Sequence, residues 1–305
     1  MIKSTFPVFE PLTVGHKADI ESFTSKFPPY SDFNFTSLYC WNTNGCVAVS
    51  TLNGNLVVRF CDYLTGLPLY SFLGDQKTGE TALALLALSK EEGLEPQLKL
   101  VPEVAVAGMD PATLTVTEDE DNADYLLPID KLTSYAGNRL GGKRNFVNRF
   151  KAAYSWETRL LDLSDAADQK AIMDMFAAWA DGKGLDASFS ENERKALTGI
   201  FPLAKVQPLL TPAIFVGDQL AGFAIVEPLG GGDAILHFEK ADAKGFVGIY
   251  QMVMMETARI LAEKGCTTLN YEQDLGIAGL RKTKKSFTPS GYLRKYRVVW
   301  NGAAK

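Results

Sequence analysis

The chain has 305 residues, of which 46% are hydrophobic and 22% are charged. These fractions are typical of folded globular domains and exclude disordered, collagen-like and coiled-coil chains. The length predicts two domains. The four cysteines form no C-x-x-C pair and there are only two histidines, so the sequence predicts neither a disulfide scaffold nor a metal site.

The sequence predicts a cytoplasmic protein without a transmembrane segment. Residues 1–14 contain Pro7 and Pro11 and lack the continuous apolar stretch of a signal peptide. The longest strongly apolar run, residues 82–88, is much shorter than the roughly 18 residues that indicate a membrane span.

The net charge is −5, and it is unevenly distributed. Residues 1–155 contain 13 basic and 18 acidic side chains, whereas residues 156–305 contain 18 of each. This balance argues against general nucleic-acid binding. Two local patches are basic, however, because residues 139–151 contain five basic side chains without an acid and residues 281–297 contain seven. Either patch is suited to contact tRNA phosphates.

The first half of the chain predicts a helix, an antiparallel meander and a second helix. We expect a helix over residues 17–26, strands over 46–51, 55–61 and 67–73, and a helix over 78–92 that ends at Gly93. Asn53 and Gly54 predict the hairpin turn between the first two strands. The acidic residues 118–124 predict an exposed loop, and residues 125–129 lead into a helix that ends near Tyr154.

The second half repeats this order. We expect strands over residues 156–163, 205–216, 220–228, 234–241, 267–271 and 295–300, and helices over 165–181, 191–200, 246–264 and 277–284. The repeat indicates an α+β protein made of two diverged modules, residues 1–155 and 156–305, with mixed, mostly antiparallel sheets. The second module would carry the active cleft.

Three segments of the sequence are distinctive: the aromatic stretch 30–41 (YSDFNFTSLYCW), the basic stretch 142–150 (GKRNFVNRF) and residues 272–282 (EQDLGIAGLRK). Together they resemble an uncharacterised bacterial family related to the C-terminal domain of phosphatidylglycerol lysyltransferase. The resemblance covers nearly the whole chain. It implies two acetyltransferase-like (GNAT) folds in tandem, and relatives that move an aminoacyl group from a charged tRNA to an amine or hydroxyl of a lipid or peptide.

The resemblance leaves coenzyme A as an alternative donor. Acetyltransferases hold its pyrophosphate with backbone amides at a helix N-terminus, where small residues allow a close approach. In the corresponding turn, residues 243–250, Gly245 and Gly248 occupy such positions and Tyr250 begins the helix. The spacing differs from the usual loop and Phe246 intrudes, which weakens the case for a coenzyme A thioester.

The strand over residues 234–241 carries the first candidate catalytic group. Alternation places His237 and Glu239 on one face and Lys240 on the other. Glu239 would accept a proton from the attacking acceptor, while His237 and Lys240 would bind substrate. The alternative is a polar pair at a sheet edge.

Further candidates follow the strand predicted over residues 267–271. Asp274 is the second candidate catalytic carboxylate, and Glu272 would hold an ammonium group. Arg281 and Lys282 would face phosphate or a carboxylate. The alternative is a capped helix with a solvated basic face. We expect Glu239, Tyr250, Asp274 and Arg281 to converge around one open pocket.

Arg144 and Asn148 lie along one stripe of the helix predicted to end near Tyr154, and together with Lys143 they would follow a phosphate backbone. The alternative is a solvated helix face. With no Ser/His/Asp triad or P-loop in the sequence, we expect direct transfer by positioning. The hypotheses are aminoacyl transfer from tRNA to a small molecule or lipid head group, N-acyl transfer from acyl-coenzyme A, and a non-catalytic binding module.

Overall fold

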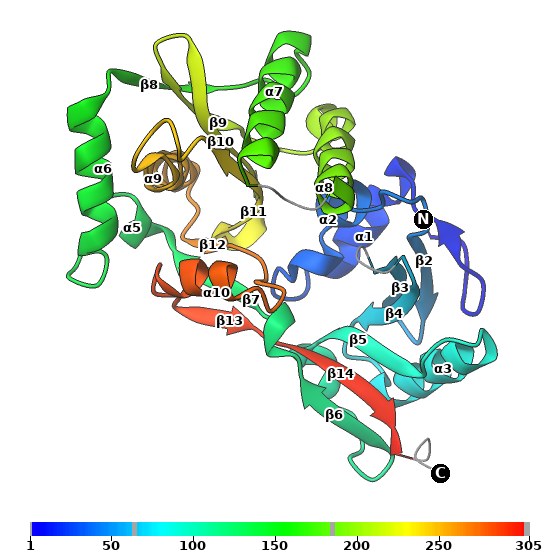
Figure 1. Cartoon of the computed structure of the whole chain (residues 1–305). Coiled ribbons are helices and arrows are strands. Elements are labelled where there is room, and N and C mark those ends of the chain that lie inside the picture. The colour runs from blue at the N-terminus through cyan, green and yellow to red at the C-terminus, as the bar shows by residue number, and fades with distance from the viewer. Residues whose placement is uncertain (1, 63–65, 184–186, 302–305) are drawn as a thin grey trace. The chain divides into compact units, whose positions relative to one another are not determined.

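The computed structural model describes residues 2–62, 66–183 and 187–301 (Figure 1). The chain forms two compact units. The first contains residues 1–124, 273–277 and 292–305, and the second contains 125–272 and 278–291. A single boundary at residue 155 therefore does not describe the two units. Residues 125–155 belong to the second unit because Val147 and Phe150 pack in its core.

The first unit contains a seven-stranded sheet in the order β1-β2-β3-β4-β5-β14-β6. Its strands are β1 (Glu10–Pro11), β2 (Ala48–Leu52), β3 (Asn55–Cys61), β4 (Pro68–Leu73), β5 (Gln97–Pro102), β6 (Leu114–Glu118) and β14 (Lys295–Trp300). Its α-helices are α1 (Lys17–Thr24), α2 (Phe35–Cys40), α3 (Thr78–Glu91) and α4 (Glu103–Val106). Short 3-10 turns cover Val14–His16, Ser31–Phe33 and Glu120–Asn122.

The second sheet also has seven strands, in the order β13-β7-β12-β11-β10-β9-β8. Its strands are β7 (Asp124–Pro128), β8 (Trp156–Leu160), β9 (Pro212–Val216), β10 (Gln219–Pro228), β11 (Asp233–Ala241), β12 (Thr268–Asn270) and β13 (Gly291–Leu293). The helices are α5 (Ile129–Leu132), α6 (Gly141–Ala153), α7 (Ala166–Lys183), α8 (Ala187–Ile200), α9 (Ile249–Glu263) and α10 (Ala278–Lys285). Short 3-10 turns cover Phe201–Lys205 and Gly230–Gly232.

The two sheets share one topology. In each sheet, the last strand of an antiparallel meander is followed by a helix and then by a strand that pairs with it in parallel. In the first sheet β4 pairs with β5, and α3 connects them. In the second sheet β11 pairs with β12, and α9 connects them. Each sheet then takes its sixth strand from a distant part of the sequence. β14 pairs with β5, and β7 pairs with β12. This shared order confirms the expected tandem α+β modules with mixed, mostly antiparallel sheets.

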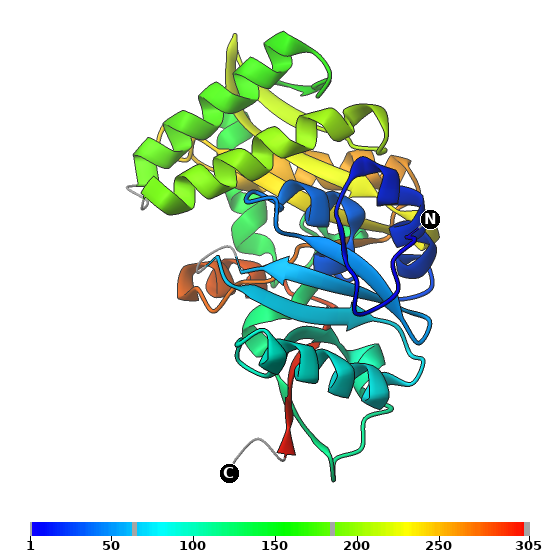
Figure 2. The ribbon, with the colours of Figure 1, turned by 90° about the vertical axis from the view of Figure 1, so that its right-hand side faces the viewer.

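Helices cover both faces of the second sheet. α9 packs on β9, β10 and β11, and α7 packs on β10, β11 and α8. The two groups of helices lie on opposite faces of the sheet (Figure 1), and α7 and α8 run side by side across one of them (Figure 2). The core between α9 and the sheet is apolar and fully buried, with Leu236, Met252 and Leu269 among its members.

Several elements differ from the sequence-based expectation. The helix expected to reach Tyr154 is two helices, α5 and α6, because Tyr135 and Gly137 adopt positive φ values of 51° and 90° and break the helix. The strand expected from residue 205 begins only at Pro212, after the 3-10 turn that contains Pro202. The strands β1, β5, β6, β7 and β13 were not predicted.

Cys46 and Cys61 form a disulfide, with their Cα atoms 6.1 Å apart. The pairing of Ala48 with Arg59 in β2 and β3 extends by two residues to place the two cysteines opposite each other. This bond was not predicted from the sequence. Within the described residues, no helix combines the length and the apolar character needed to cross a bilayer.

Candidate functional site

The parallel pairing of β11 with β12 ends before β11 does. The paired residues are Asp233 with Thr268, Ala234 with Leu269 and Ile235 with Asn270, whereas β11 continues to Ala241. Beyond Asn270 the chain turns, with Glu272 at a positive φ of 55° and its N–H donating to Asn270 Oδ1 at 2.7 Å. Residues 236–241 of β11 therefore lie beyond the segment that pairs with β12, and the polar side chains among them belong to the candidate site.

Glu239 is the central group of this site. Its Oε2 accepts a hydrogen bond of 2.8 Å from Tyr271 Oη, whereas its Oε1 is inaccessible to solvent and accepts no hydrogen bond from the residues that the structure describes. Burial raises the pKa of Glu239 to about 7, against the opposing effects of the Tyr271 hydrogen bond and of three nearby lysines, Lys240, Lys143 and Lys284. The carboxylate is therefore close to half protonated near neutral pH.

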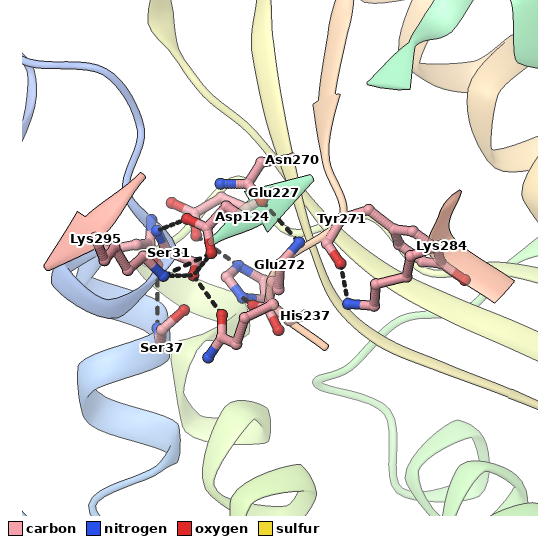
Figure 3. Close-up of polar contacts among 12 residues, drawn as sticks. Ser31, Ser37, Asp124, Glu227, His237, Asn270, Tyr271, Glu272, Lys284 and Lys295 are labelled. Carbon is pink, nitrogen blue, oxygen red and sulfur yellow. Dashed lines mark hydrogen bonds and ion pairs between the residues drawn. The ribbon is translucent and has the colours of Figure 1, made fainter. Parts of the chain in front are cut away.

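Aromatic rings and two lysines surround Glu239. The Phe287 ring packs edge-on against Tyr271 and at an angle against Tyr135. Lys143 Nζ lies 3.3 Å from the centre of the Phe287 ring, and burial lowers the pKa of Lys143 to about 8. Lys284 Nζ lies 4.7 Å from the centre of the Tyr271 ring and donates to the Tyr271 carbonyl oxygen (Figure 3). We call Lys143, Glu239, Tyr271, Lys284 and Phe287 the Glu239 site.

His237 is held between two carboxylates in the second unit. Its Nε2 lies 3.0 Å from Glu227 Oε2, and its Nδ1 lies 3.7 Å from Glu272 Oε1 (Figure 3). Burial alone would lower the pKa of His237, but the two carboxylates outweigh it and raise the pKa to about 9. The imidazolium is therefore charged at neutral pH and orients Glu272, so it has no free lone pair with which to act as a base.

Lys240 and Tyr250 contact the helices on the α7 side. Lys240 Nζ lies 2.7 Å from Glu193 Oε1 and 4.1 Å from the centre of the Trp179 ring. Trp179 Nε1 donates to Tyr250 Oη at 2.9 Å. Burial raises the pKa of Tyr250 to about 12, and the negative charge of Glu239 acts in the same direction. Tyr250 thus lies close enough to Glu239 for the carboxylate charge to raise its pKa. Lys240 is engaged in an ion pair with Glu193.

The turn between β11 and α9 is occupied by its own side chains. Asp242 Oδ1 accepts from the backbone N–H groups of Lys244 at 3.2 Å and Gly245 at 2.8 Å. Gly248 has a φ of 91°, and a Cβ there would lie 2.4 Å from the Phe146 carbonyl oxygen of α6. Gly248 therefore allows close packing of α6. Two amides of the turn, those of Lys244 and Gly245, therefore face a carboxylate, which does not fit the pyrophosphate of coenzyme A at these amides.

The remaining predicted residues divide between the units. Asp274 is fully buried in the first unit, where its Oδ1 accepts from Gly276 N at 2.9 Å. Arg281 and Lys282 lie on α10 in the second unit. The convergence of Asp274 and Arg281 with Glu239 and Tyr250 stays a prediction.

On α6, Arg144 and Asn148 are exposed. The Arg144 guanidinium donates to the carbonyl oxygens of Tyr135 at 2.7 Å and Gly137 at 3.3 Å, so it also holds the segment between α5 and α6.

A buried ionic cluster in the first unit was not predicted from the sequence. Lys295 Nζ lies 2.7 Å from Asp124 Oδ1 and forms a second ion pair with Asp32. Ser31 donates to Asp124 through its N–H at 2.8 Å and its hydroxyl at 2.7 Å (Figure 3). Lys295 and Asp124 are both fully buried. Tyr271 and Lys284 of the Glu239 site were also missed, because no local pattern distinguishes them from core and surface residues.

Residues 25–299 match the model of the family described as phosphatidylglycerol lysyltransferase, C-terminal. The chain belongs to this family. No curated protein matches it. A conserved protein of unknown function from Bacteroides thetaiotaomicron is 25% identical, with a TM-score of 0.84 over 99% of this chain and 100% of that one.

Two other solved structures share the fold. The C-terminal domain of a putative lysylphosphatidylglycerol synthetase from Agrobacterium fabrum is 14% identical, with a TM-score of 0.65 over 95% of this chain and 92% of that one. L-PGS from Bacillus licheniformis is also 14% identical, with a TM-score of 0.61 over the same shares of the two chains. The fold is thus the tandem GNAT-like arrangement that the sequence analysis expected.

Proposed function

We propose that the protein is an acyltransferase that moves an aminoacyl group from aminoacyl-tRNA to an amine or hydroxyl acceptor. The observation that carries the proposal is Glu239, whose buried Oε1 accepts no hydrogen bond within the described part of the chain and whose pKa is raised to about 7. A carboxylate with a pKa near the working pH is suited to take a proton from an acceptor N–H or O–H. Membership of a lysyltransferase family supports the same class of reaction.

The reaction needs no protein nucleophile. The acceptor attacks the ester carbonyl of the donor, the new bond to carbon forms, and the bond to the ribose oxygen breaks. Glu239 takes the acceptor proton and then passes it to the ribose oxygen, which leaves as a hydroxyl. Orientation of the two substrates supplies most of the rate enhancement for such an activated ester. Lys143, Arg281 and Lys282 are the cations that we assign to the donor phosphates.

The β11–α9 turn favours this donor over acyl-coenzyme A. The Asp242 carboxylate already accepts hydrogen bonds from Lys244 and Gly245, so a pyrophosphate placed there would meet a negative charge. A tRNA donor does not require that turn. N-acyl transfer from acyl-coenzyme A is therefore the alternative that the experiment must distinguish.

The test uses the full chain with a mixture of radiolabelled aminoacyl-tRNAs and with acceptors offered separately, as phosphatidylglycerol vesicles, glycerol and a primary amine. We expect consumption of one aminoacyl-tRNA to depend on an acceptor. Glu239→Gln should lower the transfer rate by about 10²-fold or more while donor binding persists, because general-base catalysis contributes about 10²- to 10⁴-fold. The matched control is Glu263→Gln, an exposed carboxylate at the end of α9.

Three outcomes contradict parts of this proposal. Full activity of Glu239→Gln would remove Glu239 from the reaction. Transfer from acetyl-coenzyme A without transfer from aminoacyl-tRNA would favour the alternative donor. A thermal shift with aminoacyl-tRNA but no transfer to any acceptor would favour a binding module.

A further inference from the structure

A pocket of about 300 Å³ lies beside the start of α3 (Thr78–Glu91), within the first unit. One wall is the beginning of α3, which is labelled in Figure 1. The other comes from residues in the segment 108–114, which leads from α4 into β6. The walls approach each other at Gly79 and Gly108, because a Cβ on Gly79 would lie 3.8 Å from the Gly108 carbonyl oxygen. The pocket is at the lower end of the usual size range for small-molecule pockets.

The first turn of α3 has no side-chain cap. The residue before it, Lys77, has a φ of 44° and makes no hydrogen bond from its side chain to the helix. A lysine side chain carries only donors, so it cannot accept from the amides that follow. The amide of Thr81 donates to the Lys77 carbonyl oxygen at 3.0 Å. The three amides before it, those of residues 78–80, have no acceptor among the described residues.

The hydroxyl of Thr78 is a further donor without a partner in this pocket. Thr78 is only 4% exposed, and its Oγ1 makes no hydrogen bond within the part of the chain that the structure describes. The hydroxyl lies against the opposite wall, since a Cβ on Gly108 would be 2.8 Å from Thr78 Oγ1. A threonine in a helix populates two χ1 rotamers, so this hydroxyl can turn toward a ligand at the helix start. A buried hydroxyl without a partner costs stability that a bound acceptor would restore.

The charged side chains of the lining are Lys77, Glu80 and Asp110. Asp110 is engaged in its own turn, where it accepts from Ala112 N at 2.9 Å and from Thr113 Oγ1 at 3.0 Å. Lys77 Nζ lies 3.6 Å from Glu80 Oε2, in an ion pair whose side chains are 64% and 67% exposed. Such an exposed pair is weak. A doubly charged anion at the helix start therefore competes with Glu80 for the Lys77 ammonium.

We propose that this pocket binds a small phosphate monoester, with its phosphate group at the N-terminus of α3. The amides of residues 78–80 and the Thr78 hydroxyl donate to the phosphate oxygens, and the helix dipole adds to the attraction. Lys77 supplies the positive charge. Leu83 and Leu114 belong to the same lining and contact the organic part of the ligand.

Thr78→Val separates a ligand-binding role from a structural one, because valine keeps the shape of the side chain and removes only the hydroxyl. The ligand-free variant should melt at a higher temperature than the wild type, since it no longer buries an unpaired hydroxyl. Its affinity for a phosphate monoester should fall about tenfold or more, as expected for a lost hydrogen bond to a charged group. The matched control is Thr117→Val, which removes an exposed hydroxyl of β6 away from the pocket lining.

The two charged residues at the helix start should act in opposite directions. Lys77→Gln should weaken binding of the monoester by about two- to fivefold, and Glu80→Gln should strengthen it by a similar factor. Both side chains are exposed, so neither substitution disturbs the core.

The experiment titrates the full chain at pH 7.5 with phenyl phosphate, inorganic phosphate and phenol in separate series. The readouts are the amide NMR signals of residues 78–80 and the melting temperature, because the basic patches elsewhere on the chain also attract phosphate. We expect these amide signals to move and saturate with phenyl phosphate, to need more inorganic phosphate for the same change, and to stay in place with phenol.

Three results would overturn the proposal. They are amide signals of residues 78–80 that do not move with phenyl phosphate, an affinity of Thr78→Val equal to that of the wild type, and equal affinities for phenyl phosphate and inorganic phosphate. The last would remove the assignment to a monoester. None of the probes needs tRNA or an acceptor, so these results are independent of the proposed function.

Discussion

The buried ion pairs of Lys295 are predicted to be a major contribution to the stability of the first unit. Lys295 is fully buried and lies 2.7 Å from Asp124 Oδ1, with Asp32 as its second partner. Replacement of Lys295 by Met keeps most of the side-chain volume but leaves two carboxylates without their cation. Removing one partner of a buried ion pair costs about 3–5 kcal/mol. That cost is a large part of the total stability of a typical domain, about 5–15 kcal/mol.

The control for the buried Lys295 ion pairs is an ion pair that is accessible to solvent. Lys17 Nζ lies 2.7 Å from Glu21 Oε2 on α1, at the same N–O distance but with side chains that are 29% and 38% exposed. Such a pair contributes only about 0.5 kcal/mol, so Lys17→Met should hardly change stability. Urea unfolding of both variants, followed by circular dichroism, measures the two effects under identical conditions.

The pH dependence separates an electrostatic cause from a packing cause. In Lys295→Met the buried carboxylates lose their cation, so their pKa values in the folded state rise above those of the unfolded chain. Groups with raised carboxylate pKa values destabilise the fold at pH values above them, and the loss shrinks as the pH falls. We expect the deficit of Lys295→Met to shrink between pH 8 and pH 5. A deficit below about 1 kcal/mol at pH 7, or one that is independent of pH, would refute this reasoning.

Two further predictions concern the second unit. Because the pKa of His237 is raised to about 9, its ion pairs should contribute stability that is complete below pH 6.5 and is lost as the pH rises through 9, a change on the order of 3 kcal/mol. His237→Gln should therefore be much less stable than the wild type at pH 6 and nearly equal to it at pH 10, and a constant difference in the urea midpoint would contradict this. Gly248→Ala should cost more than about 2 kcal/mol through strain and collision, because the new Cβ would lie 2.4 Å from the Phe146 carbonyl oxygen. Gly265→Ala, with a φ of 82° and no described atom within 4 Å of a Cβ, should cost only about 1 kcal/mol, and equal thermal shifts of the two variants would refute the packing argument.

Local signals predicted the meanders and the long helices. Asn53 and Gly54 adopt positive φ values of 53° and 83°, as the hairpin between β2 and β3 requires. The apolar spacing over residues 78–92 gave α3 almost to the residue. These signals are local because hairpin turns and helix periodicity depend on residues within a few positions of each other.

The candidate site was only partly accessible to such reasoning. Alternation on β11 indicated Glu239, which lies among Tyr271, Lys143 and Lys284. Tyr271 carried no signal of its own, because a tyrosine in a predicted strand is usually a core residue. The cluster around Lys295 depends on partners 171 and 264 positions away, Asp124 and Ser31. No periodicity or spacing connects residues at such separations.

The placement of β7 and β14 predicts how the chain behaves when it is divided. A cut after residue 155 separates β7, α5 and α6 from the sheet and the α9 helix against which they pack, and it separates β14 from its neighbours β5 and β6. The fragment 156–305 would then expose the apolar surface that Leu127, Val147 and Phe150 cover in the second unit. An exposed apolar face and an unpaired strand edge favour aggregation.

We therefore expect the fragment 156–305 to be insoluble or non-cooperative on its own. Coexpression with residues 1–155 should restore a soluble one-to-one complex, because the missing strands and helices return to their sheets. Urea unfolding and light scattering measure both properties. Cooperative unfolding of a monomeric 156–305 fragment would show that β7 and α6 are dispensable, since a single cooperative transition is the behaviour of an independently folded small domain. In that case the exchanged strands would join two units that are already folded, and the repeat boundary near residue 155 would be a true domain boundary.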